Sequence, residues 1–323
     1  MVEVSIIVLT YNSDWKKLCK TIKSAVSQKK IDFEIIICDD GSNVEFVEHL
    51  KEYMQTYDSV RYNLIIHKNN VGIVKNYFDG ILVAKGKYIY GISPGDYFYN
   101  DEVLCNLFNF AEKKNSKIVY GDAVFYKSYD QKGKKVNLFH NLVKPPYDLH
   151  ALEKPDKKSL EKLLFFDNNI IGATYFRRKD AAHKYIGEFV DIATYMEDFT
   201  SLSYAIAEGV SIEHYDGYVI WYEYGEGIST NENSKWNELL NIDRKNAVHH
   251  MMGVYAENKT LRALFTLKYL NGKVEKLKYL LKGHVDILLD LICIKIFGSK
   301  NKREIHRHPI DTNMIDFLYE DKE

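Results

Sequence analysis

Two short apolar runs near the start of the chain constrain its fold more than any other feature. Residues 4–9 and 34–38 are rich in β-branched side chains, are too short for helices and end in polar turn residues, as buried parallel strands do. Between them, Ser13 or Asp14 can cap a helix whose apolar residues recur three and four positions apart. The pattern predicts a strand–helix–strand unit of an α/β fold.

Polar residues follow both strands, at what would be one edge of the sheet. The two turns read Thr10, Tyr11, Asn12 and Asp39, Asp40, Gly41, Ser42. Ligands of open α/β sheets bind beyond the carboxyl ends of the strands. An aromatic ring there can stack on a nucleotide base, and a carboxylate can accept a hydrogen bond from the base. An ordinary Asp-Gly turn would also account for Asp40 and Gly41, but the position opposite Tyr11 favours nucleotide binding.

Strands and helices alternate as far as about residue 122. We expect strands over 60–67, 87–92, 117–120 and 218–222, and helices over 44–57, up to 84, over about 101–114 and from 196 to 207. This rhythm predicts a mostly parallel sheet that is covered by helices on both faces. Residues 127–160 are richer in Lys, Asp, Pro and Gly, which predicts a long insertion over the site.

Charge and cysteine content narrow the class of protein. The formal net charge is -1 at pH 7, which argues against a general nucleic-acid binder. The four cysteines form no C-x-x-C pair, so neither a zinc site nor a disulfide framework is expected. The chain enters its first strand at Val4 with no signal peptide before it, so we expect a cytoplasmic location.

The chain changes character at residue 231. Residues 231–323 read as helices with leucine-rich faces, and 259–307 carry twelve Lys or Arg against four Asp or Glu, a balance of +8. The most apolar part, 285–297, is too short and too charged to span a bilayer. Such a tail suits peripheral docking to the anionic inner face of the plasma membrane. A homodimer interface would use the leucine faces equally well, so both interpretations stay open.

The ordered set of motifs resembles family-2 glycosyltransferases, which are inverting enzymes with the fold called GT-A. S-I-I-V-L-T-Y-N and D-D-G-S match the family's opening, with Leu9 in place of its usual proline. The resemblance continues with gaps to about Thr230. It implies a Rossmann-like catalytic domain over 1–230, in which 1–122 bind the nucleotide-sugar and 123–230 the acceptor. Residues 231–323 then form a helical C-terminal appendage.

The resemblance also implies roles for individual residues. Tyr11 would stack on the base and Asp40 would accept its N–H, which suits uracil or thymine, and we expect the donor to be a UDP-sugar. Lys75 stands where the family has a basic residue near the donor diphosphate, although a solvated helix lysine would look the same. The full set expected to bind the donor is Thr10, Tyr11, Asn12, Asp39, Asp40, Lys75, Ser93 and Asp96.

The pair Glu197-Asp198 matches the family's catalytic E-D pair. The resemblance makes Asp198 the general base that deprotonates the acceptor hydroxyl, so that the anomeric configuration inverts. Acidic pairs are also common at helix starts, where they complement the macrodipole. The donor motifs upstream favour the catalytic interpretation.

The family's usual D-x-D metal loop is altered in this chain. The matching positions hold Ser93, Pro94, Gly95 and Asp96, so only the last acidic position survives. We expect Asp96 to hold Mn²⁺ or Mg²⁺ against the diphosphate, with water completing the coordination. One alternative is a metal-free site in which Lys75 neutralises the diphosphate. Another is a tight turn in which Asp96 only caps the next helix.

Relatives with a similar ending to the domain build capsule or other surface polysaccharides. The resemblance therefore implies a hexosyltransferase that acts on a hydroxyl of a glycan or of a lipid-linked oligosaccharide. The alternative is a non-catalytic homologue that binds nucleotide-sugar and partners an active glycosyltransferase, which the altered Ser93–Asp96 loop favours. A sugar nucleotidyltransferase is discounted, because the Thr10–Asn12 turn lacks the glycines of a phosphate loop.

Overall fold

The computed structural model describes residues 1–126, 140–141, 156–166, 170–225, 227, 234–297 and 310. Most of the predicted 127–160 insertion lies outside this part of the chain, as do Asn168 and Asn169, which resemble a family stretch under the acceptor pocket. Most of residues 225–230, which resemble a family loop that closes over the diphosphate, also lie outside it, as does the predicted domain junction at 230/231.

The first half of the chain forms a parallel sheet with crossover helices, as predicted. The elements are β1 (Val4–Thr10), α1 (Trp15–Val26), β2 (Phe33–Asp39), α2 (Val44–Gln55), β3 (Tyr62–Ile66), α3 (Ile73–Val83) and β4 (Tyr88–Ile92). Strands β3, β2, β1 and β4 lie side by side in that order, and all three pairings are parallel. Asp14 caps α1 by accepting a hydrogen bond from the Lys17 N–H, and Asn43 caps α2 in the same way.

The second half extends this sheet with mixed pairing. It contains β5 (Tyr97–Phe98), α4 (Val103–Lys114), β6 (Ile118–Tyr126), β7 (His140–Asn141), α5 (Lys157–Phe165), β8 (Tyr175–Arg178), α6 (Lys179–Gly187), α7 (Glu197–Ala207) and β9 (Ile212–Glu223). The strand order is β3-β2-β1-β4-β8-β6-β9-β5, with β7 beside β6. β8 is antiparallel to both β4 and β6, whereas β6 and β9 are parallel, so antiparallel pairs join the two parallel parts of the sheet.

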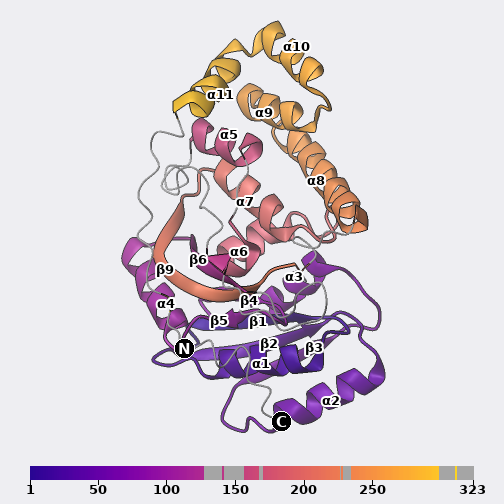
Figure 1. Ribbon diagram of the computed structural model, residues 1–323, viewed down its shortest axis with the longest axis vertical. Coiled ribbons are helices and arrows are strands. Elements are labelled where there is room, and N and C mark those ends of the chain that lie inside the picture. The colour runs from indigo at the N-terminus through magenta and orange to yellow at the C-terminus, as the bar shows by residue number, and fades with distance from the viewer. Residues whose placement is uncertain are drawn as a thin grey trace.

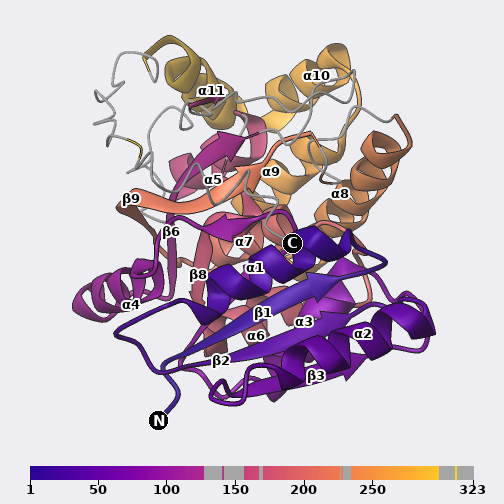
Figure 2. The same ribbon diagram turned by 60° about the horizontal axis from the view of Figure 1, so that its bottom comes forward.

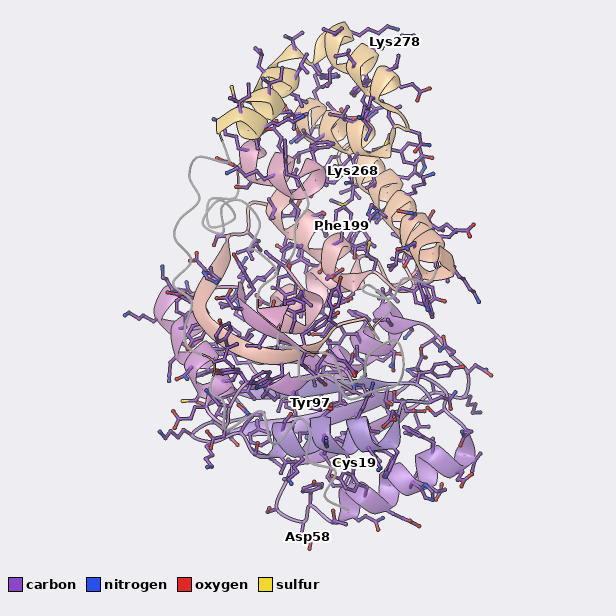
Figure 3. All side chains as sticks on the ribbon, in the orientation of Figure 1. Cys19, Asp58, Tyr97, Phe199, Lys268 and Lys278 are labelled. Carbon is purple, nitrogen blue, oxygen red and sulfur yellow. The ribbon has the colours of Figure 1, made fainter. Side chains whose placement is uncertain are left out.

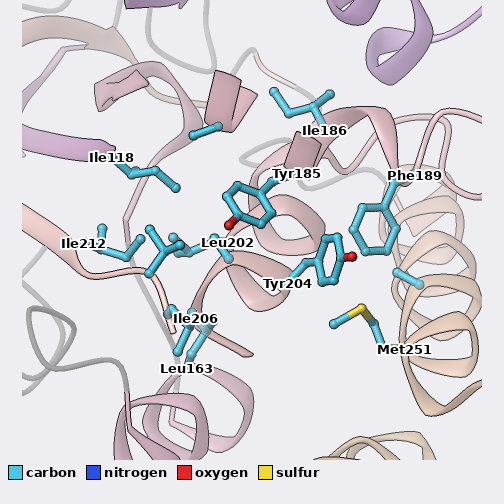
Figure 4. Close-up of a cluster of buried hydrophobic side chains, with 14 of the residues drawn as sticks. Ile118, Leu163, Tyr185, Ile186, Phe189, Leu202, Tyr204, Ile206, Ile212 and Met251 are labelled. Atoms are coloured by element: carbon cyan, nitrogen blue, oxygen red, sulfur yellow. The ribbon is translucent and has the colours of Figure 1, made fainter. Parts of the chain in front are cut away.

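Helices cover both faces of the sheet, and each face has its own apolar core. One core packs α1, α2 and α4 against the strands, and Figure 2 shows α1 in front of β1 on this side. The other core joins α3, α5, α6 and α7 to the opposite face. Figure 4 shows how Tyr185 of α6, Tyr204 of α7 and Met251 of the C-terminal region meet in it.

The C-terminal region is helical, as predicted, and shares the second core. It consists of α8 (Ser234–Val254), α9 (Lys259–Tyr269), α10 (Lys273–Gly283) and α11 (Val285–Phe297). Figure 1 shows these helices, in orange to yellow, on the side of the molecule away from β1 and β2. Met251, Leu264, Leu280 and Ile287 are buried in the core that α5, α6 and α7 also build. Among the described residues, none of the helices is both long and apolar enough to cross a membrane.

Candidate functional site

The turns after β1 and β2 are tied to each other by hydrogen bonds. Asn12 adopts the left-handed conformation, with φ of 44°, and its N–H donates to the Ser42 hydroxyl at 2.7 Å. The Asn43 N–H donates back to Asn12 Oδ1 at 3.2 Å. Tyr11, which directly precedes Asn12, remains 49% exposed. The turn therefore presents an aromatic side chain at the carboxyl edge of the parallel sheet, as the sequence predicts.

Asp39 and Asp40 are both buried, and each carboxylate organises a loop. Asp39 accepts hydrogen bonds from the N–H and hydroxyl of Ser42, at 2.8 and 2.5 Å. Asp40 accepts from the Val71 N–H at 2.7 Å and from the Gly72 N–H at 3.0 Å, one bond on each oxygen. Burial raises the pKa of Asp40, while these two N–H groups lower it. A role of Asp40 toward a base stays a prediction.

Lys75 lies on the first turn of α3 and is paired within its own helix. Its ammonium group binds Asp79, one helical turn later, and His67 Nε2 lies 3.4 Å from the other Asp79 oxygen. The side chain is 42% exposed. This is the arrangement expected of a surface helix lysine, and a contact with a diphosphate stays a prediction.

The loop from Ser93 to Asp96 is fixed by α1. Thr21 accepts a hydrogen bond from the Gly95 N–H at 3.2 Å and donates to the Asp96 carbonyl at 2.9 Å. Gly95 has φ of +100°, and a Cβ there would overlap a carboxylate oxygen of Glu223, so only glycine fits. Ser93 is exposed, whereas Asp96 is 8% exposed. The loop leads into β5, where Figure 3 labels Tyr97.

Asp96 and Glu223 are buried next to each other, and the ammonium group of Lys17 is paired with Glu223. Asp96 Oδ1 accepts a hydrogen bond from the Glu223 N–H at 3.3 Å. Lys17 Nζ lies 2.8 Å from both carboxylate oxygens of Glu223. Burial raises the pKa of Asp96 well above its usual range, and the Glu223 charge raises it further.

These residues fit a resident Mn²⁺ or Mg²⁺ poorly. Asp96 is buried, and the second carboxylate nearby is neutralised by Lys17. Within the described ranges, no three His, Cys, Asp or Glu side chains are grouped so that they could hold a metal ion. Hard divalent cations need several oxygen ligands, so we derive no chemical step through a metal. The metal at Asp96 stays a prediction from the sequence.

Glu197 and Asp198 occupy the first turn of α7, beside a buried arginine. Glu197 lies against Gly172, where a Cβ would come 3.0 Å from Glu197 Oε1. Burial raises the pKa of both carboxyl groups, and the Asp198 charge raises that of Glu197 further. The Arg177 guanidinium, only 3% exposed, lowers both pKa values and stacks 4.4 Å from the Tyr175 ring centroid. The pair is therefore a half-buried acid–base group with a buried cation beside it.

Two buried tyrosines connect this pair to the loop at Asp96. Tyr77 is influenced by Arg177 and by Glu197, which lower and raise its pKa respectively. Tyr90 is influenced by Asp96 and by Tyr77, and both raise its pKa beyond the effect of burial. Tyr77 in the middle of α3 and Tyr90 in the middle of β4 are therefore within electrostatic reach of the acidic pair and of the altered loop, which are about a hundred residues apart in sequence.

Three of these residues were not recognised as site residues from the sequence. Arg177 lies in the segment Phe176-Arg177-Arg178, to which the sequence alone assigns no role, and Lys17 and Glu223 have no local signal. Lys17 and Glu223 are 206 positions apart, so only the pairing of β9 with the rest of the sheet brings them together. A charge directly after two aromatic residues of a strand-like run is the one signal that could have pointed to Arg177.

Curated relatives match somewhat more than a third of the chain. Poly(ribitol-phosphate) beta-glucosyltransferase of Bacillus spizizenii is 31% identical over 122 residues, which are 37% of this chain and 19% of the relative. Cholesterol galactosyltransferase of Borreliella burgdorferi is 32% identical over 124 residues, or 38% of this chain and 33% of the relative. The chain therefore matches less than half the length of each.

A solved structure and a family model extend the comparison. S. aureus TarS 1–349 in complex with UDP-GlcNAc superposes with a TM-score of 0.57 at 16% identity, over 90% of this chain and 81% of that one. This likeness shows that the two proteins share the GT-A fold. The model described as glycosyl transferase family 2 matches residues 5–184, more than half of the 323 residues. On these grounds the chain belongs to glycosyl transferase family 2.

Proposed function

We propose that the protein is an inverting glycosyltransferase that moves a sugar from a UDP-sugar to a hydroxyl group of a surface glycan. The observation that carries this proposal is the half-buried Glu197-Asp198 pair, which lies beside Arg177 and follows a segment that contacts the loop held by Asp40. Family membership and the names of the relatives support the reaction class. The UDP complexes of TarS, a protein of the same fold, support the choice of donor.

The proposed reaction uses the acidic pair and the two turns. Tyr11 stacks on uracil, while the turn held by Asp40 places the rest of the donor. Asp198, in its charged form, removes the proton from the acceptor hydroxyl as that oxygen attacks the anomeric carbon. The bond to UDP breaks on the opposite face, so the configuration inverts. Arg177 lowers the pKa of Asp198 and so favours the charged form that acts as a base.

A non-catalytic homologue that binds nucleotide-sugar remains the second candidate. The observation in its favour is the Ser93–Asp96 loop, whose surviving carboxylate is buried against Glu223. Such a protein would bind UDP-sugars and partner an active enzyme without turning them over.

Replacing Asp198 by asparagine separates these two candidates. Asparagine keeps the size of the side chain but cannot take a proton, so we expect turnover to fall by about 10²–10⁴-fold with donor affinity unchanged. The measurement is UDP release from a panel of UDP-sugars, with lipid-linked glycan extracts as acceptors. Asp191→Asn, an exposed change a few residues before α7, is the control.

The same assay has a predicted pH dependence. Because the pKa of Asp198 is raised, its carboxylate form is lost as pH falls through that raised value. Turnover should therefore decline at a higher pH than the ordinary aspartate pKa of about 3.9 would give. Near-normal turnover of Asp198→Asn would remove the base assignment, and no release from any donor by the wild type would favour the non-catalytic candidate.

The binding of UDP tests whether Asp96 holds a metal ion. Since Lys17 neutralises Glu223 and Asp96 is buried, we expect UDP to bind with the same affinity in Mn²⁺ and in a chelator. Isothermal calorimetry on the wild type and on Asp96→Ala measures this. A gain in affinity with Mn²⁺ that disappears in Asp96→Ala would instead restore Asp96 as a metal ligand.

We further propose that α10 and α11 dock on an anionic membrane face, where a lipid-linked acceptor would lie. Val285, Leu289, Ile292 and Ile296 of α11 are exposed at a spacing of four, three and four residues, which puts them on one helical face. Exposed Val274, Leu277 and Leu281 form a similar face on α10. Four lysines of α10, among them Lys278 at the top of Figure 3, supply the complementary charge for anionic headgroups.

Vesicle binding distinguishes membrane docking from dimerisation. Leu281 and Leu289 are 59% and 57% exposed, so we expect Leu281→Gln with Leu289→Gln to reduce co-sedimentation with phosphatidylglycerol vesicles. Leu82→Gln, at a 50% exposed leucine of α3, should leave binding unchanged. A stable dimer in sedimentation analysis, together with equal binding to neutral and anionic vesicles, would contradict the membrane proposal.

A further inference from the structure

The start of α7 is held by a carboxylate from another helix. The N-cap residue of α7, Met196, has no side chain that could accept a hydrogen bond from the helix. Asp243 of α8 instead binds the backbone just before the helix, because its Oδ2 accepts from the N–H groups of Thr194, Tyr195 and Met196 at 2.9, 2.5 and 3.1 Å. Asp243 is 4% exposed. A negative charge at a helix N-terminus also complements the helix dipole.

Two further side chains of α8 contact the same segment. The Trp236 ring packs edge-on against Tyr195, with centroids 5.6 Å apart. The Arg244 guanidinium lies 5.7 Å from the ring centroid of Phe199, which directly follows the acidic pair. Lys268 of α9 approaches that ring from 5.8 Å, and Figure 3 labels both residues near the centre of the molecule. The C-terminal helices thus hold the segment that carries Glu197 and Asp198.

The held segment also touches the donor side of the site. The Thr194 carbonyl accepts a hydrogen bond from the Val74 N–H at 3.1 Å, and Thr194 packs so closely on Gly72 that a Cβ there would overlap it. Gly72 is one of the two residues whose N–H groups Asp40 holds. Asp40 and Asp243 therefore each fix one side of a single contact, between the loop before α3 and the loop before α7.

We propose that Asp243 is a positioning residue, which fixes the Glu197-Asp198 pair against the donor side of the site. This inference rests on the proposed function, in which Asp198 acts on the acceptor hydroxyl. The physical reason is that three N–H groups converge on one oxygen, which leaves the start of α7 little freedom to shift. Misplacement of a reacting group by about 1 Å can cost about 10²-fold in rate. Donor binding depends on the Asp40 side of the contact, so a change at Asp243 should affect it little.

Three variants test the inference. Asp243→Ala removes all three acceptor contacts, and Asp243→Asn keeps a neutral carbonyl oxygen that can still accept some of them. Glu238→Gln removes a charge from an exposed position of the same helix and serves as the matched control. We expect kcat for UDP release to fall by about 10²-fold in Asp243→Ala and by less in Asp243→Asn, with KM for the donor nearly unchanged. A purely structural role would instead reduce kcat in step with the melting temperature.

Hydrogen exchange tests the same contact without any assay of turnover. In Asp243→Ala, the backbone N–H groups of residues 194–196 should exchange faster, and so should that of Val74, which donates to the Thr194 carbonyl. Unchanged exchange at these positions would overturn the inference. If Asp198→Asn abolishes UDP release while both Asp243 variants retain it, the positioning role fails and the proposed function stands. If the wild type releases no UDP, the proposed function fails, and exchange still reports on the contact.

Discussion

The arrangement of the site depends on buried carboxylates that bind backbone N–H groups. Asp40 at the end of β2 and Asp243 on α8 hold the two loops that meet where Thr194 touches Gly72. A hydrogen bond to a charged group contributes about 1.5–3 kcal/mol, and an unmet buried charge costs at least as much. The donor turns and the acidic pair can therefore keep a fixed relation only while both carboxylates retain their partners. The C-terminal helices are part of this arrangement, although the family model ends at residue 184.

The electrostatics of the site differ from those expected of the family's metal loop. Where two aspartates would hold a divalent cation, this chain has a tight glycine turn against Glu223 and an ion pair between Glu223 and Lys17. Lys17 of α1 therefore supplies the positive charge at this loop. Arg177 supplies a positive charge beside the acidic pair, where it lowers the pKa of both carboxyl groups. In each half of the site, a cationic side chain lies close to carboxylates that come from another part of the sequence.

The sequence predicted the parts of the structure that local patterns determine. Strands β1, β2 and β4 and their helices follow from apolar periodicity, and the turns at Tyr11 and Asp40 follow from the strand ends. The mixed pairing of β8, β6 and β9 was not predictable, because register between distant strands is set by packing that no short window contains. The same limit applies to Asp243, whose role depends on where α8 lies rather than on its neighbours in the chain. Lys75 shows the opposite case, since its pairing with Asp79 one turn away was readable from the sequence.

We propose above all that a uracil nucleotide binds at the turns after β1 and β2. Calorimetry with UDP tests this binding site most directly. Tyr11 is the suitable residue to change, because its ring is 49% exposed and the turn is held by Asn12 and Ser42 instead. Tyr11→Ala should weaken UDP binding by about 1–3 kcal/mol, the usual contribution of a base stacked on an aromatic ring, and should leave the melting temperature unchanged. Equal UDP affinity in the wild type and Tyr11→Ala would contradict the account and would place the donor elsewhere.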